Sequence, residues 1–291
     1  MTPGMAAARS PGRPAHRPPW SYLPVVFAEA GKTMRIWLSY PIMVFFWGVF
    51  PLLWVMPFVF QGKALVGGMD SAAFRQLTGS GNYLAFVLIG AMVSTFVFSA
   101  LWGVGNSLRE ETYWGTMEYI IASPTPPLVI LIGKTLAEWF MATVMVVFQA
   151  AIISIFFGVQ FTVAKVLPVL LICGLLMVGF YGFAIAFAGF TLLIKEVHGW
   201  VHTLEWVFFL FSPIRYPVQV NPITQAVSTL IPLTWALVAI RGIILLNRND
   251  VPLLKTVGVL LAMDAVLLVG GYLLFGVLER KTRRDGTVGM H

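Results

Sequence analysis

The side chains that could do chemistry are few in this sequence and fall into three groups. His198 and His202 lie four residues apart and Glu205 follows three residues later, so the three could share one helix face and ligate a metal ion. Asp264 lies inside the apolar segment "LLAMDAVLLVGG", where an ionisable group is costly and commonly functional. The third group is residues 109–127, "REETYWGTMEYIIASPTPP", which gathers three glutamates and an arginine around Trp-Gly-Thr.

The first two groups also have ordinary explanations. The histidines are predicted to lie at a membrane interface, where polar side chains are expected, and they form no defined ligand set, so we predict no metal site. For Asp264 two interpretations stay open: a proton or substrate site, and a carboxyl group hydrogen-bonded to a neighbouring helix. The sequence contains no G-x-x-x-x-G-K-[ST] phosphate loop and no H-E-x-x-H or G-x-S-x-G motif. We therefore predict no catalytic residues, no enzymatic activity and no cofactor in this chain.

The composition is that of a membrane protein. Hydrophobic residues make up 58% of the chain and charged residues only 11%, whereas a soluble domain has roughly 25% charged residues. Four stretches contain no Asp, Glu, Lys or Arg and are long enough to span a bilayer as helices: 36–62, 76–108, 139–164 and 166–194. They lack the polar alternation of β-barrel strands. The predicted fold is an all-α integral membrane protein.

Basic residues gather near the two ends of the chain. They are not interleaved with aromatics on one surface, which argues against nucleic-acid binding. By the positive-inside rule, this distribution places both termini in the cytoplasm and requires an even number of spans in the cytoplasmic membrane. Six transmembrane helices are predicted, at residues 37–60, 83–107, 132–157, 166–193, 199–217 and 256–278.

Further segments complete the predicted architecture. Residues 21–35 have apolar positions at helical spacing opposite Glu29 and Lys32, which is typical of an amphipathic helix on the cytoplasmic leaflet. Between spans five and six, Pro222 and Pro232 interrupt an apolar segment and favour re-entrant or outer-leaflet helices. The remaining segments are a disordered basic tail at 1–20, an outside loop at 61–81 and a cytoplasmic tail at 281–291.

The segment "LREETYWGTMEYIIASPTPP" resembles the cytoplasmic loop between spans two and three of ABC-2 type permeases, the membrane subunits of ATP-binding-cassette exporters. That loop has an acidic pair, a variable pair, Gly-Thr-hydrophobic-Glu and a later Ser/Thr-Pro. Here these are Glu110-Glu111, Tyr113-Trp114, Gly115-Thr116-Met117-Glu118 and Ser123-Pro124. Gly133-Lys134 matches the usual opening of span three, and "IPLTWALVAIRGIIL" at 231–245 is similar to the family's segment before the last span. The resemblance implies an ABC-2 type transmembrane domain over residues 21–280.

The resemblance also implies that residues 109–122 form a coupling helix that docks in a groove of an ATPase subunit. The residues assigned to docking are Arg109, Glu110, Glu111, Tyr113, Trp114, Gly115, Thr116 and Glu118. As a single helix ended by Pro124, the segment would place Tyr113, Met117 and Ile120 on one side, for anchoring in the membrane interface. Glu111, Trp114 and Glu118 would take another side, facing the ATPase.

The partners implied by the resemblance are a second permease, identical or homologous, and two separate ATPase subunits that bind ATP and Mg. Spans two and five would line the path, with candidate residues Thr95, Phe96, Trp102, Phe208, Phe209 and Phe211. Because these spans hold few polar groups, we expect a hydrophobic or amphipathic substrate such as a drug, a lipid or a natural product. Lys134 and Glu138, four residues apart, are expected to form a structural ion pair.

Two alternatives from other classes stay open. A proton-coupled secondary transporter would use Asp264 as its titrating residue and would need no ATPase partner. A non-transporting membrane scaffold would tolerate changes at Glu111, Trp114 and Glu118 without loss of function.

Overall fold

The computed structural model describes residues 19–66, 72–159, 161–191, 193, 197–246 and 252–285, and these residues are almost entirely helical. Most of the predicted N-terminal tail, and residues 286–291 of the predicted C-terminal tail, lie outside them. The long helices are α2 (Pro41–Val66), α4 (Tyr83–Ser99), α7 (Pro127–Phe157), α8 (Val163–Thr191) and α12 (Pro252–Asp285). The shorter elements are η1 (Pro19–Tyr22), α1 (Leu23–Ser39), α3 (Ala72–Thr78), η2 (Ala100–Gly105), α5 (Ser107–Tyr113), α6 (Met117–Ala122), α9 (Val197–Phe211), η3 (Val218–Val220), α10 (Pro222–Ser228) and α11 (Pro232–Leu245).

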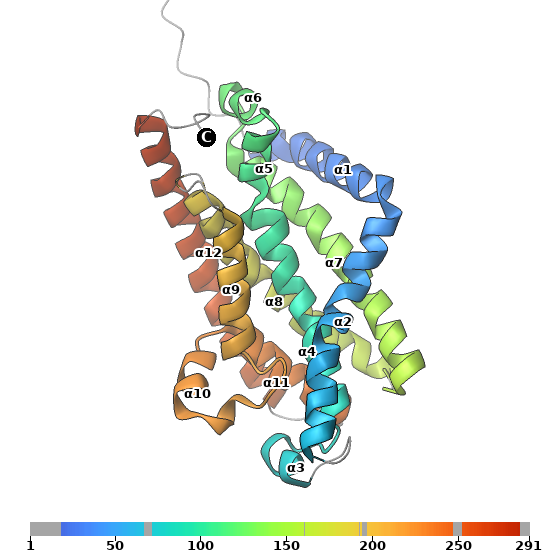
Figure 1. Cartoon of the computed structure of the whole chain (residues 1–291). Helices are drawn as coiled ribbons and strands as arrows, with labels where there is room; N and C mark the ends of the chain where they lie inside the picture. Colours follow the sequence, from blue (N-terminus) through green and yellow to red (C-terminus); the bar gives the residue numbers. More distant parts are fainter. Residues whose placement is uncertain are drawn as a thin grey trace, which may run out of the picture.

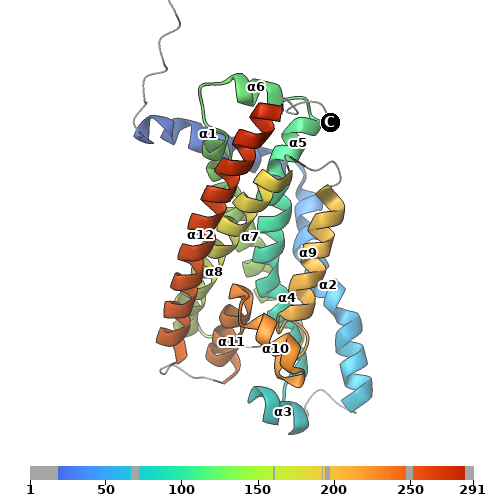
Figure 2. The ribbon, with the colours of Figure 1, turned by 90° about the vertical axis from the view of Figure 1, so that its left-hand side faces the viewer.

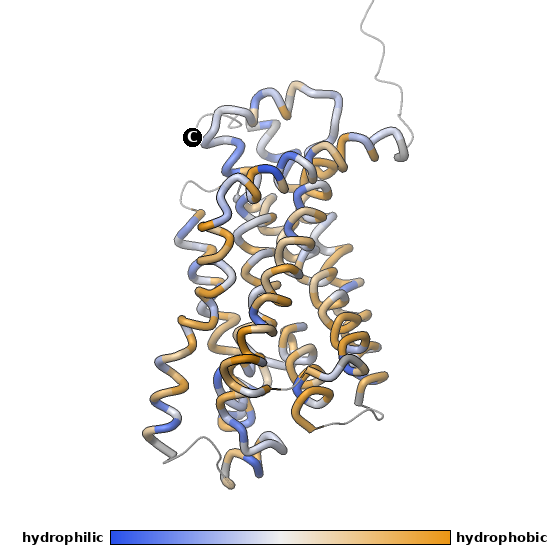
Figure 3. The backbone as a smooth tube through the Cα atoms, turned by 90° about the vertical axis from the view of Figure 1, so that its right-hand side faces the viewer, coloured by the Kyte–Doolittle hydropathy of each residue, from blue (hydrophilic) through white to orange (hydrophobic). Residues whose placement is uncertain are grey.

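Five helices in the described ranges are long and apolar enough to cross a membrane, namely α2, α4 with its continuation η2, α7, α8 and α12. They run together through one bundle, as Figure 1 and Figure 2 show. Figure 3 shows hydrophobic residues along the length of the bundle and hydrophilic residues gathered mainly near its two ends. Because hydrocarbon offers backbone groups no hydrogen bonds, a spanning chain satisfies them within helices. The predicted all-α membrane fold is confirmed.

The predicted fifth span is shorter than expected. α9 has 15 residues and ends at Phe211 instead of reaching residue 217. Pro213 and Pro217 explain this end, because proline cannot donate a backbone hydrogen bond and disfavours helix in the residue before it. α10 and α11 meet at 96° and form either one broken span or a re-entrant pair, so the number of spans is five or six. This bent pair corresponds to the predicted re-entrant or outer-leaflet helices.

α1 lies across one end of the bundle, as the predicted interfacial helix would (Figure 2). It crosses α7 at Gly133, where a Cβ atom would lie only 2.7 Å from the carbonyl oxygen of Val26 and 2.7 Å from Cβ of Glu29. A residue without a side chain is therefore required for this close approach. The glycine of the Gly133-Lys134 pair seats α1 on α7.

The bundle is held together by close packing around α4 and between α8 and α12. Every side chain of α4 between Ala85 and Val97 is buried, apart from Gly90, which has none. α8 and α12 approach through small residues, since a Cβ atom at Gly271 would lie 2.1 Å from the Gly182 carbonyl oxygen. In a membrane, such small-residue contacts give helices the van der Waals packing that drives their association.

Arg241 joins α11 to this core. Its guanidinium donates to the carbonyl oxygens of Phe86 at 2.6 Å and Ile214 at 3.0 Å, and also to that of Pro213. The same group lies 3.4 Å from the centroid of the Phe86 ring. Arg241 thus fixes α11 both to α4 and to the irregular segment that follows α9.

Several predicted boundaries change in the structure. α2 continues to Val66 and α3 follows it, so much of the predicted outside loop at 61–81 is helical. α7 begins at Pro127 and not at residue 132, because proline is well suited to the first turn of a helix. α12 continues to Asp285, which makes the first residues of the predicted C-terminal tail part of this helix.

Candidate functional site

The segment between the second and third predicted spans forms two short helices at the end of the bundle that carries α1 (Figure 1). α5 ends at a turn formed by Trp114 and Gly115, and α6 follows it. Gly115 has φ +70°, in the left-handed region that favours glycine. The structure thus replaces the predicted single helix over 109–122, and its two opposite sides, by a broken pair. We call residues 107–122 the docking element.

The outer surface of the docking element is aromatic. Tyr113, Trp114 and Tyr119 are 87%, 55% and 78% exposed, and Glu118 and Gly115 are exposed as well. Large aromatic side chains are typical anchors of protein interfaces. Tyr119 was not among the predicted docking residues; it becomes exposed because α6 starts anew after the break at Gly115.

Glu111 lies on the inner side of the docking element, and its side chain is only 3% exposed. Its Oε1 atom lies 3.0 Å from Nζ of Lys134 and 3.2 Å from Nζ of Lys32, while the Thr116 hydroxyl donates to Oε2. Lys134 also donates to the Ser107 carbonyl oxygen at 3.3 Å. Since Lys32 belongs to α1 and Lys134 to α7, Glu111 ties α5 to both helices. The predicted exposure of Glu111 is therefore corrected, because its carboxylate is engaged within the chain.

The charges around Glu111 stabilise its ionised form. Burial alone would raise the pKa of the Glu111 carboxyl, but the Thr116 hydroxyl and the ammonium groups of Lys134 and Lys32 outweigh burial and lower this pKa. Partial burial opposes the charge of Lys32, yet its two carboxylate partners raise its pKa overall. For Glu110, burial raises the pKa more than the nearby lysines lower it. Glu110 and Arg109 are both only partly exposed.

A cavity of about 570 Å³ lies between α1, α2, α4, η2, α7 and α9, and Glu110 of α5 and Trp114 also belong to its lining. This volume falls within the roughly 300–1,000 Å³ typical of ligand pockets. The lining is mostly apolar and rich in large side chains, among them Trp37, Tyr40, Trp47, Phe50, Trp54, Phe98, Trp102, Met141, Met145 and Trp206. Such a lining suits an apolar or amphipathic ligand.

The predicted path residues are divided by this cavity. Thr95, Trp102 and Phe209 line it. Phe96 and Phe208 are instead buried in the hydrophobic core, and Phe211 is outside the lining. Helical spacing alone did not separate these aromatics, because core packing and cavity lining place the same kind of residue on adjacent faces.

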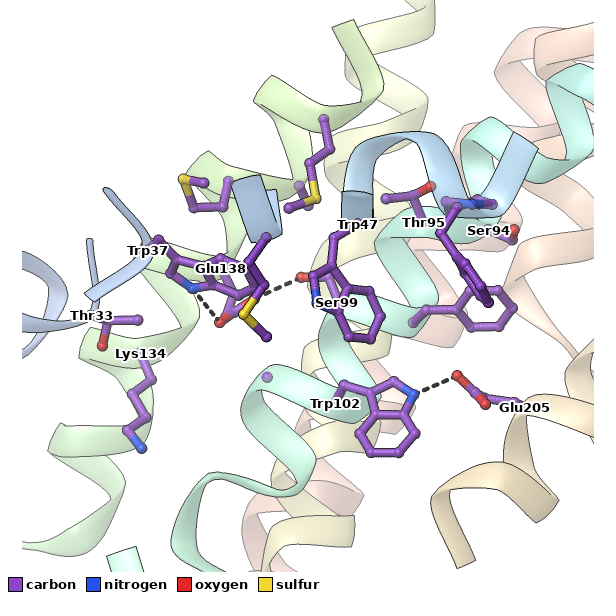
Figure 4. A pocket seen from close by; sticks show the side chains of 18 of the residues that line it. Thr33, Trp37, Trp47, Ser94, Thr95, Ser99, Trp102, Lys134, Glu138 and Glu205 are labelled. Carbon is purple, nitrogen blue, oxygen red and sulfur yellow. Dashed lines mark hydrogen bonds between the residues drawn. The ribbon is translucent and has the colours of Figure 1, made fainter. Parts of the chain in front are cut away.

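Glu138 of α7 is the most buried carboxylate of the cavity (Figure 4). Trp37 Nε1 donates to its Oε1 at 3.3 Å, and the Ser99 hydroxyl donates to its Oε2 at 3.0 Å. The predicted ion pair with Lys134 is wrong, because Lys134 binds Glu111 and its ammonium group points away from Glu138 (Figure 4). Sequence reasoning missed these partners; its only signal was a carboxylate at the inner end of an apolar span.

The backbone of the second span makes room for Glu138. Here α4 passes into the π-helical segment η2, which contains Gly103. A Cβ atom at Gly103 would lie 2.4 Å from Cδ of Glu138, so only glycine accommodates the carboxyl group in this position. Short π-helical segments inside α-helices occur frequently at functional sites.

Glu205 of α9 supplies a second carboxylate to the cavity. Its Oε1 accepts a hydrogen bond from Trp102 Nε1, and its Oε2 lies 3.0 Å from Nδ1 of His202. The rings of His198 and His202 pack against the Trp102 indole, with centroids 5.7 and 5.0 Å away. The three residues considered as metal ligands thus surround an indole. Within the described ranges, no three His, Cys, Asp or Glu side chains come together as a metal-binding group.

A family model described as ABC-2 type transporter matches residues 32–245. This range contains the docking element, the bent pair α10–α11 and all of the cavity lining. The chain belongs to the ABC-2 type transporter family. Comparison with curated proteins gave no match.

As an ABC-2 type transporter, the chain is the permease component of an ABC transporter and a multi-pass membrane protein. Membership of this family implies that it works with an ATP-binding-cassette subunit. Two features of the described residues stand out, namely the exposed aromatic side chains of the docking element and the volume of the cavity.

Asp264 of the permease lies apart from both. It is buried where α12 meets α8, and a Cβ atom at Gly179 would lie 2.2 Å from its Oδ1. Neither carboxyl oxygen has a hydrogen-bond partner in the described part of the chain, so the interpretation of a carboxyl bonded to a neighbouring helix finds no acceptor or donor there. Asp264 does not line the cavity.

Proposed function

We propose that this permease is the membrane subunit of an exporter for hydrophobic or amphipathic substrates, such as a drug, a lipid or a natural product. Export would be driven by ATP hydrolysis in separate ATPase subunits. Two permeases, this chain with a second copy or a homologue, would pair with two ATPases in the cytoplasmic membrane. Residues 21–280 would form the transmembrane domain, with both termini in the cytoplasm.

The observation that carries this proposal is the exposed aromatic surface of the docking element. In the family, this segment meets the ATPase. Tyr113, Trp114 and Tyr119 project from one broken helical pair, and Glu118 adds a carboxylate that a basic or amide group could bind. Clustered aromatic anchors with a charged neighbour are typical of interface hot spots.

The distribution of charge supports a cytoplasmic position for the docking element. α12 ends at the same end of the bundle as α1, α5 and α6 (Figure 1). That last part of α12 carries Arg280, Lys281 and Arg284, and α1 carries Lys32 and Arg35. Basic residues that flank spans favour the cytoplasmic side.

The contacts of Glu111 support a way to couple ATPase motion to the spans. A displacement of the docking element would act on α1 through Lys32 and on α7 through Lys134. Both helices border the cavity. Motion at the ATPase surface would therefore reach the walls of the substrate site through two ion pairs and would not depend on backbone connection alone.

The experiment that tests the proposal is co-purification of this chain with the ATP-binding-cassette ATPases of its own organism, beginning with any that is encoded beside its gene. The variant Tyr113→Ala with Tyr119→Ala removes two exposed anchors that do not line the cavity, and it is compared with Ile223→Ala, which trims a side chain that is 70% exposed on α10 at the opposite end of the bundle. We expect the wild type and Ile223→Ala to retain the ATPase and its substrate-stimulated ATP turnover. The double variant should lose both.

Two results would contradict the proposal. In the first, no ATPase associates with the wild type in detergent or in lipid nanodiscs. In the second, the double variant binds the ATPase as tightly as Ile223→Ala does. Equal binding would mean that the exposed aromatics serve another partner or the membrane surface.

A further inference from the structure

The cavity is lined by three glutamates, and two of them, Glu138 and Glu205, accept hydrogen bonds from indole N–H groups. We propose that it selects lipophilic cations, with Glu138 and Glu205 as the residues that recognise the positive charge. This inference rests on the proposed export function and names its substrate class. It follows from the hydrogen-bond partners of Glu138 and Glu205, from the ion pairs that engage the nearby lysines and from the aromatic lining.

Glu138 is held by neutral groups alone. Its two oxygens accept hydrogen bonds from an indole N–H and a hydroxyl, and no Lys, Arg or His nitrogen of the described residues lies within 4.0 Å of them. A buried carboxylate that lacks a positive partner is costly, and the cost falls when a cation enters. The empty volume beside Glu138 gives such a cation access.

The two lysines that line the cavity do not act as positive partners of Glu138. Lys32 and Lys134 both contribute to the cavity wall, but Lys32 pairs with Glu29 at 3.0 Å and both lysines pair with Glu111. The carboxylates of Glu29 and Glu111 thus balance the charges of the two ammonium groups. Glu110, the third glutamate of the lining, interacts with the charges of both lysines. Recognition of a cation is therefore left to Glu138 and Glu205.

Glu205 repeats the arrangement on another helix. The Trp102 indole donates to one of its oxygens. The other oxygen contacts Nδ1 of His202, and an imidazole is positively charged only when it is protonated. Figure 4 shows the indoles of Trp37, Trp47 and Trp102 around the same space as both carboxylates. Faces of tryptophan attract cations, most strongly where water is excluded. Carboxylates and indole faces together suit a cation with an apolar body.

The same contacts also have a purely structural interpretation, in which Glu138 only joins Trp37 and Ser99 and never meets a ligand. The two interpretations differ in one measurable respect. A structural hydrogen-bond acceptor is replaced well by glutamine, which keeps the shape and the acceptor oxygen but removes the charge. A charge-recognition residue is replaced well by aspartate and badly by glutamine.

The test uses the full-length chain, purified in a neutral detergent without any ATPase. Radiolabelled tetraphenylphosphonium is the probe, and tetraphenylborate, of similar size and opposite charge, is the competitor. Scintillation proximity binding is measured for the wild type, Glu138→Gln, Glu138→Asp, Glu205→Gln and Asp264→Asn. The last variant removes an intramembrane carboxylate outside the cavity and serves as the matched control.

We expect saturable tetraphenylphosphonium binding that tetraphenylborate does not displace. Each glutamine variant should weaken binding at least about tenfold, which corresponds to about 1.4 kcal/mol, while Asp264→Asn should bind as the wild type does. Glu138→Asp should restore part of the affinity. If Glu138→Gln does not elute as a single species, the comparison of Glu205→Gln with Asp264→Asn decides the question.

The proposal is overturned if the wild type shows no saturable binding, if tetraphenylborate competes equally well, or if the glutamine variants bind as the wild type does. Because no ATPase is present, these outcomes do not depend on the docking experiment. Failure of the docking experiment alone would leave a cation-binding membrane protein with another energy source. Failure of the binding experiment alone would leave an ATPase-coupled permease with a different substrate.

Discussion

Replacement of Glu111 by glutamine tests how firmly the docking element is attached to the bundle. The substitution leaves the Lys134 ammonium group, which is 8% exposed, without a negatively charged partner, because the glutamine amide oxygen and the Ser107 carbonyl oxygen are both neutral acceptors. Removing one partner of a buried ion pair costs about 3–5 kcal/mol. The Lys32 pair adds less than about 1 kcal/mol, because that lysine is 44% exposed. We therefore expect a loss of about 3 kcal/mol in the local stability of the docking element.

Hydrogen exchange of the docking element measures this loss directly. The amides of Trp114 and Thr116 donate to the carbonyl oxygens of Glu110 and Glu111, each at 2.9 Å, and both bonds break when the element opens. A loss of 3 kcal/mol corresponds to roughly 100-fold faster exchange at these amides. Glu118→Gln, which removes an exposed carboxylate from the same element, should leave exchange unchanged.

A double variant tests whether the loss of protection comes from the unpaired ammonium group of Lys134. Glu111→Gln combined with Lys134→Gln removes both members of the buried pair and should recover much of the lost protection, because no unpaired ammonium group remains. The reasoning is refuted if Glu111→Gln exchanges at the same rate as Glu118→Gln. It is also refuted if the double variant exchanges faster than the single one.

Three further predictions follow from close contacts elsewhere. Gly103→Ala places a methyl group 2.4 Å from Cδ of Glu138, so it should displace the carboxyl group and weaken tetraphenylphosphonium binding as strongly as Glu138→Gln. Arg241→Gln leaves buried carbonyl oxygens without a donor and should cost about 1–3 kcal/mol per lost partner, seen as a lower Tm in nanodiscs, where the exposed Arg284→Gln should have no effect. The part of the docking element's protection that depends on Glu111, taken as the difference between the wild type and Glu111→Gln, should be fully present above about pH 5 and should decline below about pH 4, because folding lowers the pKa of Glu111 and its stabilisation is lost as the pH falls through that value.

The spans could be predicted from the sequence because hydrocarbon disfavours charged side chains along the whole length of a span. Apolar runs without charge locate α2, α4 and α8, and predominantly apolar runs locate α7 and α12, although the last span was predicted to end at residue 278 and α12 continues to Asp285. The ends of helices are less certain, since the cost of continuing or stopping is small at the interface. α9 stops early at Phe211 because prolines follow it, and the prolines were visible in the sequence.

Side-chain partners could not be predicted in the same way, because they depend on how helices pack. Lys134 and Glu138 have the spacing of an ion pair on one helix. Packing brings the Glu111 carboxylate to Lys134 and the Trp37 indole to Glu138, and these partners from other helices replace the local pair. Likewise, the resemblance of residues 109–122 to the family's coupling loop implies docking, but it does not reveal that Glu111 faces inward.

The position of Lys134 and Glu138 one turn apart on α7 links the two halves of the proposed mechanism. Lys134 holds the docking element through Glu111, and Glu138 holds the cavity wall through Trp37 and Ser99. A rigid helical turn cannot move one of these contacts without disturbing the other. Under the proposed function, a cation at Glu138 and an ATPase at the docking element would act on the same turn, and any effect of one on the binding of the other must be reciprocal. Lys134 and Glu138 bind partners on other helices and not each other, and under this proposal that separation would allow one turn of α7 to serve both sites.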